Sequence, residues 1–467
     1  MSTLPPGPAE PPAIQTARWL LRPISFMESC RRRFGDVFSV SFLGFKTPMV
    51  MLSDPGAVQA LYTNPTHGLP PGRSIALMPV MGPRSVLLLE GSDHMARRRV
   101  MLPPFHGERM QAYESTVRDV AVGEIESWPE TTPFALHPRM QAVTLEVILR
   151  AVFGVTDESR RERLRRLLPQ LLDSTSSASL QFKVLLSRRF GRLDPLGFLR
   201  DLSAEIDELL LAEIAARRSD AQLDRREDIL SLLALARFED GAGMSDQELR
   251  DQLVTLLLAG HETTATALAW TADLLVRHPH VLQRLTDELD AGETDTYLRA
   301  VIKESLRLRP VVPLAGRRLA SELQVDGWTL PAGTDITPAI WLTHTRADLY
   351  PEPYAFRPER FLDQSPTTYG WVPFGGGVRR CLGAAFAEFE MRVVLTEMLR
   401  RRTLDAASAR AERVTRRNVT FSPVDGTRVT APRRARAGGS PRHAVTARSE
   451  LGPHRDEDPD LAARTSV

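Results

Sequence analysis

Apolar residues recur every three or four positions through the middle of the chain, from about residue 93 to residue 309. This spacing places them on one face of a helix, so it predicts a mainly helical body. The helical pattern is longest over residues 246–277, where about 1.5 Å per residue is enough to cross a whole domain. Ser245 and Glu248 have the spacing of a capping box, which predicts that this helix begins just after Ser245.

Short β-branched and aromatic runs lie on both sides of this helical part. Residues 36–53 predict a hairpin, a short helix follows Pro55, and two Pro-Gly or Gly-Pro steps within residues 66–85 predict a long loop. Beyond Pro310 the pattern predicts strands at 323–325, 328–330 and 335–340, a helix at 384–402, and a hairpin that pairs 419–421 with 427–430. Strands do not alternate with helices, so we expect a mainly α fold with small β-sheets.

The two ends of the chain differ from this body. The opening, residues 1–15, is rich in proline and predicts an extended lead. Residues 431–467 contain four Pro, three Gly and almost no large apolar side chains, which predicts a disordered tail. We therefore expect one folded domain over residues 1–430.

Charge and cysteine content exclude several classes of protein. The 467 residues carry 60 Lys and Arg against 58 Asp and Glu, so the chain lacks the basic surplus of a general nucleic-acid binder. Two cysteines, Cys30 and Cys381, cannot form a disulfide scaffold and favour a reducing, cytoplasmic compartment. Neither a signal peptide nor an apolar run of roughly 18 residues is visible, so we expect no membrane anchor.

The sharpest chemical signal is the segment PFGGGVRRCLGAAFA, residues 373–387, in which Cys381 lies among glycines just before a predicted helix. Glycines let several backbone amides point at one sulfur, and these amides with the helix N-terminus favour a thiolate. A lone cysteine is more often a small buried apolar side chain. Here, however, the spacing Phe374-x-x-Gly377-x-Arg379-x-Cys381-x-Gly383 is complete, and it resembles the haem-ligand loop of the cytochrome P450 family.

The resemblance covers nearly all of residues 1–430 and implies a specific fold and cofactor. It implies a triangular helical prism around a buried haem b, with Cys381 as the ligand of the iron. No flavin or iron–sulfur domain follows, so we expect electrons from NAD(P)H to arrive through a separate ferredoxin or flavodoxin and its reductase.

A second motif, Ala259-Gly260-His261-Glu262-Thr263-Thr264, lies in the middle of the long helix and resembles the family's oxygen-activation motif. The resemblance implies that Glu262 and Thr263 are catalytic and relay protons. The alternative for Thr263 is a hydroxyl that bonds back to the carbonyl of Ala259, the usual arrangement of a threonine within a helix. A zinc-binding His-Glu-x-x-His helix is excluded, because Ala265 replaces the second histidine.

Glu304 and Arg307 have the spacing of an i,i+3 helical pair, which is usually a solvated surface bridge. With Arg360 they resemble the buried Glu-Arg-Arg triad of the family, which has a structural role.

His94 and Arg98 lie one turn apart on a predicted helix, where the family contacts a haem propionate, although a solvated charge run is the alternative. Arg379 is included in the cofactor site by the resemblance. Arg317 and Arg318 compete for one further propionate contact, and counting on from Pro310 favours Arg317.

Arginines also cluster beside these motifs, at Arg97, Arg380 and Arg392. They predict a local basic patch that could steer an acidic electron donor.

The substrate signal is weaker. Residues 103–110 (PPFHGERM) resemble a bacterial branch associated with fatty-acid and alkane-type hydroxylation. Family positions imply substrate-lining residues that are nearly all apolar: Leu77, Leu87, Leu256, Ala259, Val312, Leu314 and Phe421. These features predict a monooxygenase that hydroxylates or epoxidises a fatty acid, terpenoid or polyketide. The alternatives are a haem-thiolate peroxygenase or isomerase, or a non-catalytic haem-binding module; relatives that do not use O2 often lack the acid–alcohol pair, which this chain retains.

Overall fold

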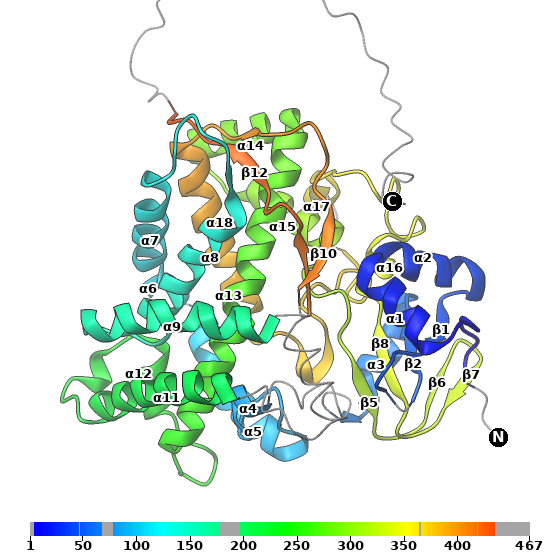
Figure 1. Cartoon of the computed structure of the whole chain (residues 1–467), viewed down its shortest axis with the longest axis horizontal. Helices are drawn as coiled ribbons and strands as arrows, with labels where there is room; N and C mark the ends of the chain where they lie inside the picture. Colours follow the sequence, from blue (N-terminus) through cyan, green and yellow to red (C-terminus); the bar gives the residue numbers. More distant parts are fainter. Residues whose placement is uncertain are drawn as a thin grey trace, which may run out of the picture.

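The computed structural model describes residues 4–45, 47–67, 78–107, 109–176, 197–363, 366–417 and 419–434, which form a large helical part and a smaller part that contains most of the strands (Figure 1). The longer helices are α1 (Pro12–Leu21), α2 (Pro23–Phe34), α3 (Pro55–Thr63), α5 (Gly91–Met101), α7 (Glu114–Glu126), α8 (Leu136–Val147), α9 (Glu158–Ser176), α11 (Gly197–Arg218), α13 (Asp246–Arg277), α14 (Pro279–Ala291), α15 (Thr296–Leu308) and α18 (Ala384–Arg401). Shorter helices are α4 (Met78–Met81), α6 (Arg109–Ala112), α12 (Ile229–Leu235), α16 (Ile340–His344) and α17 (Arg360–Asp363), with single turns η1 (Pro103–Phe105), η2 (Ile148–Val152), η3 (Leu223–Arg225) and η4 (Gly377–Arg379).

Helix α13 is the centre of the helical part and packs against α8, α11, α15 and α18. It has the predicted bounds, and the capping box forms in both directions between Ser245 and Glu248. Much of its length is buried on every side, which suits a helix in the middle of a large core. A π-helical turn, η2, continues α8, and its Ile148 lies against Gly260: a Cβ at Gly260 would be 3.7 Å from Cδ1 of Ile148.

The strands form small sheets, as the sequence predicts. A five-stranded sheet has the order β1 (Val37–Val40), β2 (Met49–Leu52), β8 (Asp335–Pro338), β5 (Arg317–Leu319) and β3 (Thr66–His67). Strands β1 and β2 are the predicted hairpin, with Val37 opposite Leu52, and β2 pairs with β8 in parallel. The predicted hairpin of β6 (Leu323–Val325) and β7 (Trp328–Leu330) is also present. The five-stranded sheet contains Arg317 in β5, and α3 follows its strand β2, so both lie in the smaller part of the molecule.

Two predictions about local structure are wrong. The hairpin between residues 419–421 and 427–430 does not form: β11 (Thr420–Pro423) pairs with β10 (Val414–Arg417), whereas β12 (Arg428–Thr430) pairs with β4 (Phe134–Ala135) and β9 (Asp405–Ala406). The chain leaves the first sheet because Glu412 accepts hydrogen bonds from the backbone of Asp425 and Thr427, and the Thr427 hydroxyl donates to the Ala269 carbonyl.

The proline-rich lead is also not extended throughout, because α1 begins at Pro12. Proline is tolerated in the first helical turn, where its missing N–H has no helical partner to lose. At the other end, residues 431–434 contact the body through ion pairs of Arg433 with Glu126 and of Arg434 with Asp290. The rest of the predicted tail lies outside the described residues.

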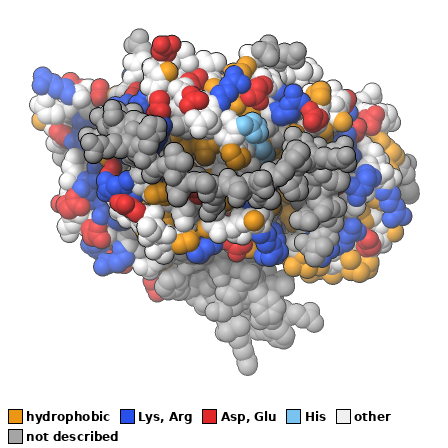
Figure 2. Space-filling model, turned by 90° about the horizontal axis from the view of Figure 1, so that it is seen from above, with side chains coloured by type: hydrophobic (Ala, Val, Ile, Leu, Met, Phe, Trp, Pro, Cys, Tyr) orange, Lys and Arg blue, Asp and Glu red, His pale blue; other side chains and the backbone are white. Residues whose placement is uncertain are grey.

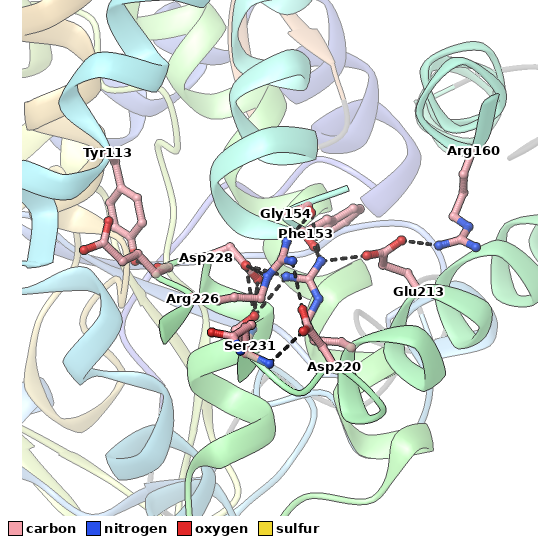
Figure 3. Close-up of polar contacts among 12 residues, drawn as sticks. Tyr113, Phe153, Gly154, Arg160, Glu213, Asp220, Arg226, Asp228 and Ser231 are labelled. Atoms are coloured by element: carbon pink, nitrogen blue, oxygen red, sulfur yellow. Dashed lines mark hydrogen bonds and ion pairs between the residues drawn. The ribbon is translucent and has the colours of Figure 1, made fainter. Parts of the chain in front are cut away.

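A buried charge network ties α11, α12 and the turn after η2 together (Figure 3). Arg217, only 2% exposed, donates to Glu213 at 2.6 Å, to Ser231 at 2.9 Å and to the Gly154 carbonyl at 2.8 Å, and it pairs with Asp228. We call this set the Arg217 network. Each buried charge in it has a partner, which is the condition under which buried charges are tolerated.

The surface is mixed in charge. Over the face seen in Figure 2, Lys and Arg side chains are interspersed with Asp and Glu, in keeping with the balanced composition. No helix among the described residues has the length and apolar character that crossing a membrane requires.

Candidate functional site

The loop that carries Cys381 is held in shape by backbone contacts. The Cys381 amide donates to the Phe374 carbonyl at 2.9 Å, and Gly375 and Gly377 adopt φ of +68° and +63°, a region that favours glycine. A Cβ at Gly377 would lie 2.5 Å from the carbonyl oxygen of Tyr62, so α3 packs directly on this loop. Helix α18 begins three residues after the cysteine, as predicted.

The surroundings of the Cys381 sulfur act on its thiol in two directions. The residue has an exposed face, yet the protein atoms packed around the sulfur raise the pKa of the thiol, while a backbone N–H of Gly383 and the charges of Arg98 and Arg380 lower it. Gly383 thus supplies one of the backbone amides that the sequence predicts around the sulfur. A metal ion bound to the sulfur would supply the positive charge that the loop alone does not.

Four basic side chains gather near this loop: His94 and Arg98 from α5, Arg317 from β5 and Arg379 from η4. Burial, followed by the positive charges of Arg379, Arg98 and Arg317, lowers the pKa of His94 to about 4. Among the described residues, none of the four forms an ion pair; Arg379 donates to the Leu89 carbonyl, and the charge of Glu90 acts on it without a direct contact. We call these side chains the cationic cluster. His94 is neutral at pH 7 with this pKa, and Arg98 and Arg379 are half-buried, so the cluster combines three guanidinium charges with one imidazole. Because cations removed from water without an ion pair are unfavourable, the cluster is suited to an anionic ligand.

Within this cluster the structure separates the two competing arginines. Arg318 pairs with Asp335, with Nε and Nη2 both 2.8 Å from Oδ1. Arg317 is 8% exposed and donates only to the Gly316 carbonyl at 2.9 Å within the described part of the chain. Arg317 is therefore the arginine whose remaining N–H donors have no acceptor among the described residues.

On α13, Ala259 is exposed although it lies in the middle of a buried helix, so open space borders this position. The Thr263 hydroxyl donates to the Ala259 carbonyl at 2.6 Å, which is the alternative arrangement considered from the sequence. The Glu262 carboxylate is held from α8, where Gln141 donates to it at 2.6 Å and His137 Nε2 lies 3.5 Å away. The acid and the alcohol thus have different partners in this structure.

The Glu304–Arg307–Arg360 triad is formed. Both oxygens of Glu304 accept from Arg307, at 2.7 and 2.8 Å, and Oε1 also accepts from Arg360 at 3.0 Å. Glu304 and Arg307 are fully buried, so this is not a solvated bridge. His344 lies against the triad, with Nδ1 3.2 Å from the Arg307 carbonyl, while its Nε2 accepts from the amide of Val372 at 2.9 Å. Burial lowers the pKa of His344 to about 3, so it is neutral and links the triad to the cysteine loop.

The predicted substrate-lining residues do not all lie together. Leu256 and Val312 are partly buried against the same helical core, and Leu87 is 38% exposed. Leu314 packs instead against a core cluster near the N-terminus, and Leu77 lies outside the described residues.

Phe421 was predicted to line the substrate site, but its side chain is 3% exposed and fills that N-terminal cluster against Trp19, with ring centroids 6.0 Å apart. The sequence predicts a strand at Phe421, whereas the direction of its side chain depends on the β10–β11 register. Val419, next to the turn of the same hairpin, is 58% exposed.

The predicted basic patch is smaller than expected. Arg97 pairs with Glu248 at 2.7 Å and Arg392 with Asp295 at 3.0 Å, because their helices bring these acids within reach. Arg380 is exposed and has no ion-pair partner within the described residues. It borders a hollow of about 230 Å³ that Arg98, His106, Cys381 and Glu388 also line.

Three contributors were missed from the sequence: Tyr62 beneath the cysteine loop, Gln141 on Glu262 and His344 beside the triad. Each comes from a segment without a motif, so only the tertiary structure could place it.

Comparisons with known proteins agree with this geometry. The model of the cytochrome P450 family matches residues 5–423. The chain is 42% identical over 437 residues to putative cytochrome P450 135B1 of Mycobacterium tuberculosis strain H37Rv, covering 91% of each, and 39% identical over 399 residues to putative cytochrome P450 137 of the same strain, covering 85% and 83%. Its fold is similar to the solved structure of retinoic acid-bound cyanobacterial CYP120A1, with a TM-score of 0.79, 25% identity, and coverage of 93% of this chain and 100% of that one. The chain therefore belongs to the cytochrome P450 family of haem-thiolate monooxygenases.

Proposed function

We propose that this P450 binds haem b between Cys381 and the cationic cluster and inserts one oxygen atom of O2 into a lipophilic small molecule, by hydroxylation or epoxidation. The proposal is carried by the cationic cluster beside the cysteine loop, in which three arginines and the neutral His94 form no ion pair with an acid among the described residues. Haem carries two carboxylates, which suit forked guanidinium donors.

The described residues fit this cofactor. Cys381 would hold the iron, and His94, Arg98, Arg317 and Arg379 would hold the propionates. When bound, thiolate-ligated haem supplies O2 activation, because the thiolate pushes electron density toward O–O cleavage. The protein supplies the position of the ring, the dry surroundings and the protons.

Proton delivery falls to Glu262 and Thr263. A carboxylate and a hydroxyl on one turn of α13 can pass protons toward the open space beside Ala259 once they share a hydrogen bond or a water. In the structure Gln141 fixes the Glu262 carboxylate and the Ala259 carbonyl accepts from Thr263, so their side chains must rotate or be bridged by water. With Thr263→Ala, we expect more peroxide and less product per NAD(P)H oxidised. An unchanged ratio would contradict the relay.

The proposed substrate class is supported by apolar residues near α13 and by similarity to other members of the family. Leu256, Ala259 and Val312 bring no charge to the α13 side, so a fatty acid, terpenoid or polyketide suits the site better than a polar metabolite. The similar cyanobacterial structure is described as retinoic acid bound, and retinoic acid is itself a lipophilic isoprenoid acid. Residues 103–110 resemble the branch associated with fatty-acid and alkane-type hydroxylation.

Electrons would come from a ferredoxin or flavodoxin with its own reductase, which takes them from NAD(P)H. The hollow that Arg98, Arg380 and Cys381 line is one surface depression that borders the cysteine. An acidic donor would be steered there by Arg380. Arg380→Glu should slow the first reduction at low salt and matter less at high salt. An unchanged rate at low salt would exclude Arg380 as a contact.

The test of the function is substrate binding followed by turnover. The haem-loaded protein is titrated with fatty acids, terpenoids and polyketides while the haem spin state is followed by absorption. Compounds that displace water should shift the spectrum toward high spin, and turnover with a ferredoxin, its reductase and isotopically labelled O2 should yield a product with one labelled oxygen. Product formed only from added hydroperoxide, with none from O2, would instead support the peroxygenase alternative.

A further inference from the structure

Tyr62 is a buried side chain that no motif explains. It is next to the last residue of α3, and it is 8% exposed. Its ring lies under the glycines of the cysteine loop: a Cβ at Gly376 would be 2.5 Å from Cδ2 of the ring, and one at Gly375 would be 3.6 Å from the hydroxyl. The loop is therefore shaped around Tyr62, with the hydroxyl at the start of the glycine run.

The Tyr62 hydroxyl has no hydrogen-bond partner among the described residues. A buried hydroxyl left unpaired is costly, which makes an orphan of this kind informative. Burial raises the pKa of Tyr62 to about 12, and the charge of Arg317 acts in the opposite direction, so the group is a neutral donor near a guanidinium.

Arg317 also lacks hydrogen-bond acceptors for most of its N–H donors among the described residues. It is buried, and of the contacts within the described residues its guanidinium makes one hydrogen bond, to the Gly316 carbonyl. The positive charge of Arg317 and the hydroxyl of Tyr62 influence each other, while no carboxylate of the described chain pairs with either. Two donors from β5 and α3 thus lie close enough to influence each other and lack an acceptor among the described residues, and a carboxylate with two oxygens would satisfy both.

We propose that the Tyr62 hydroxyl donates a hydrogen bond to the same haem propionate that pairs with Arg317. Tyr62 is then a cofactor-binding residue supplied by α3, and it fixes one edge of the haem against the glycine loop. The inference rests on the proposed haem site at Cys381, and its test is chosen to separate the two.

Tyr62→Phe removes the hydroxyl and keeps the ring that packs on Gly376. In the haem-loaded protein we expect haem transfer to excess apomyoglobin to be roughly 10- to 100-fold faster, the size of one hydrogen bond to a charged group. The propionate bending bands in the resonance Raman spectrum should also shift. The matched control is Tyr369→Phe, whose ring centroid lies 6.4 Å from that of Tyr62 and whose side chain is half-buried; it should behave as the unaltered protein.

A second comparison tests whether the carboxylate is shared. If Tyr62 and Arg317 bind one propionate, Tyr62→Phe combined with Arg317→Met should lose haem more slowly than the product of the two single effects predicts. Unchanged haem loss and unchanged Raman bands in Tyr62→Phe would overturn the proposal, and strictly multiplicative effects would overturn the shared carboxylate. If the unaltered protein itself lacked a thiolate-type CO spectrum, the haem site would fail first, independently of Tyr62.

Discussion

Arg217 and Arg317 are both buried arginines, 2% and 8% exposed, yet their surroundings are opposite. Arg217 is enclosed by Glu213, Asp228 and backbone carbonyls, so its charge is balanced within the protein. Arg317 has one carbonyl and no acid among the described residues. Arg307, which Glu304 neutralises, resembles the first case.

The comparison distinguishes buried charges that are paired within the protein and stabilise the fold from buried charges that are left unpaired and can bind a ligand. A paired buried ion holds elements together, and breaking it leaves its partner uncompensated. An unpaired buried cation stabilises nothing until an anion arrives, so the fold must be stable enough to carry it. The same contrast distinguishes the Glu304 triad, whose charges are paired, from the arginines of the cationic cluster, which form no ion pair among the described residues.

The largest expected effect is at the paired site. Arg217→Met should destabilise the protein by about 3 kcal/mol, the lower end for a broken buried pair, because Glu213 and Asp228 lose the cation that they share and keep only Arg160 and Arg226. Urea unfolding would measure this. Arg225→Met, at an exposed position of η3, is the control and should change the free energy of unfolding by less than about 0.5 kcal/mol. Equal stability of the two variants would contradict the structural role of the network.

Glu390 on α18 is a buried acid that, like the buried cation of Arg317, lacks an oppositely charged partner among the described residues. It is 3% exposed, Oε1 has no partner among the described residues, and burial raises its pKa from 4.5 to about 8. The folded protein therefore binds a proton that the unfolded chain releases, and stability should fall as pH rises from about 4.5 to about 8. At roughly 1.4 kcal/mol per pH unit at the steepest point, the loss between pH 5 and pH 7 is on the order of 2 kcal/mol. Glu390→Gln should remove this slope; a slope that persists would mean that another group causes it.

The smallest stability effect is expected at Arg317. In the haem-free protein, Arg317→Met should change the free energy of unfolding by less than about 1 kcal/mol, because it removes a charge that has no acidic partner. The same substitution should weaken haem binding clearly, in contrast to Arg217→Met. A haem titration of both variants, corrected for the folded fraction, tests the contrast. Strong destabilisation of haem-free Arg317→Met would mean that the cation already has a structural partner.

Local signals explain why much of the fold was predictable. The Ser245–Glu248 capping box and the long apolar pattern located α13 at both ends, and the β1–β2 hairpin follows from adjacent β-branched runs. The last hairpin was assigned wrongly because the partner of β12 is β4, about 290 positions earlier, and no local pattern reports such a pairing.

At the site, motifs located the chemistry but not its surroundings. The Glu304 triad forms as its motif predicts, whereas Phe421 packs in another core cluster and Arg97 pairs with Glu248. The sequence does not predict a role for Tyr62. Its hydroxyl is informative only because it lacks a partner among the described residues and lies beside a loop more than 300 positions away.

Cys381 and the cationic cluster are proposed to form one haem-thiolate site. The most direct test is the absorption spectrum of the reduced, CO-bound protein, recorded for the unaltered chain and for Cys381→Ser. Ligation of haem iron by Cys381 should give a red-shifted, thiolate-type Soret band in the unaltered protein and its loss in the variant. A spectrum typical of histidine ligation, or a thiolate band that survives in Cys381→Ser, would contradict it.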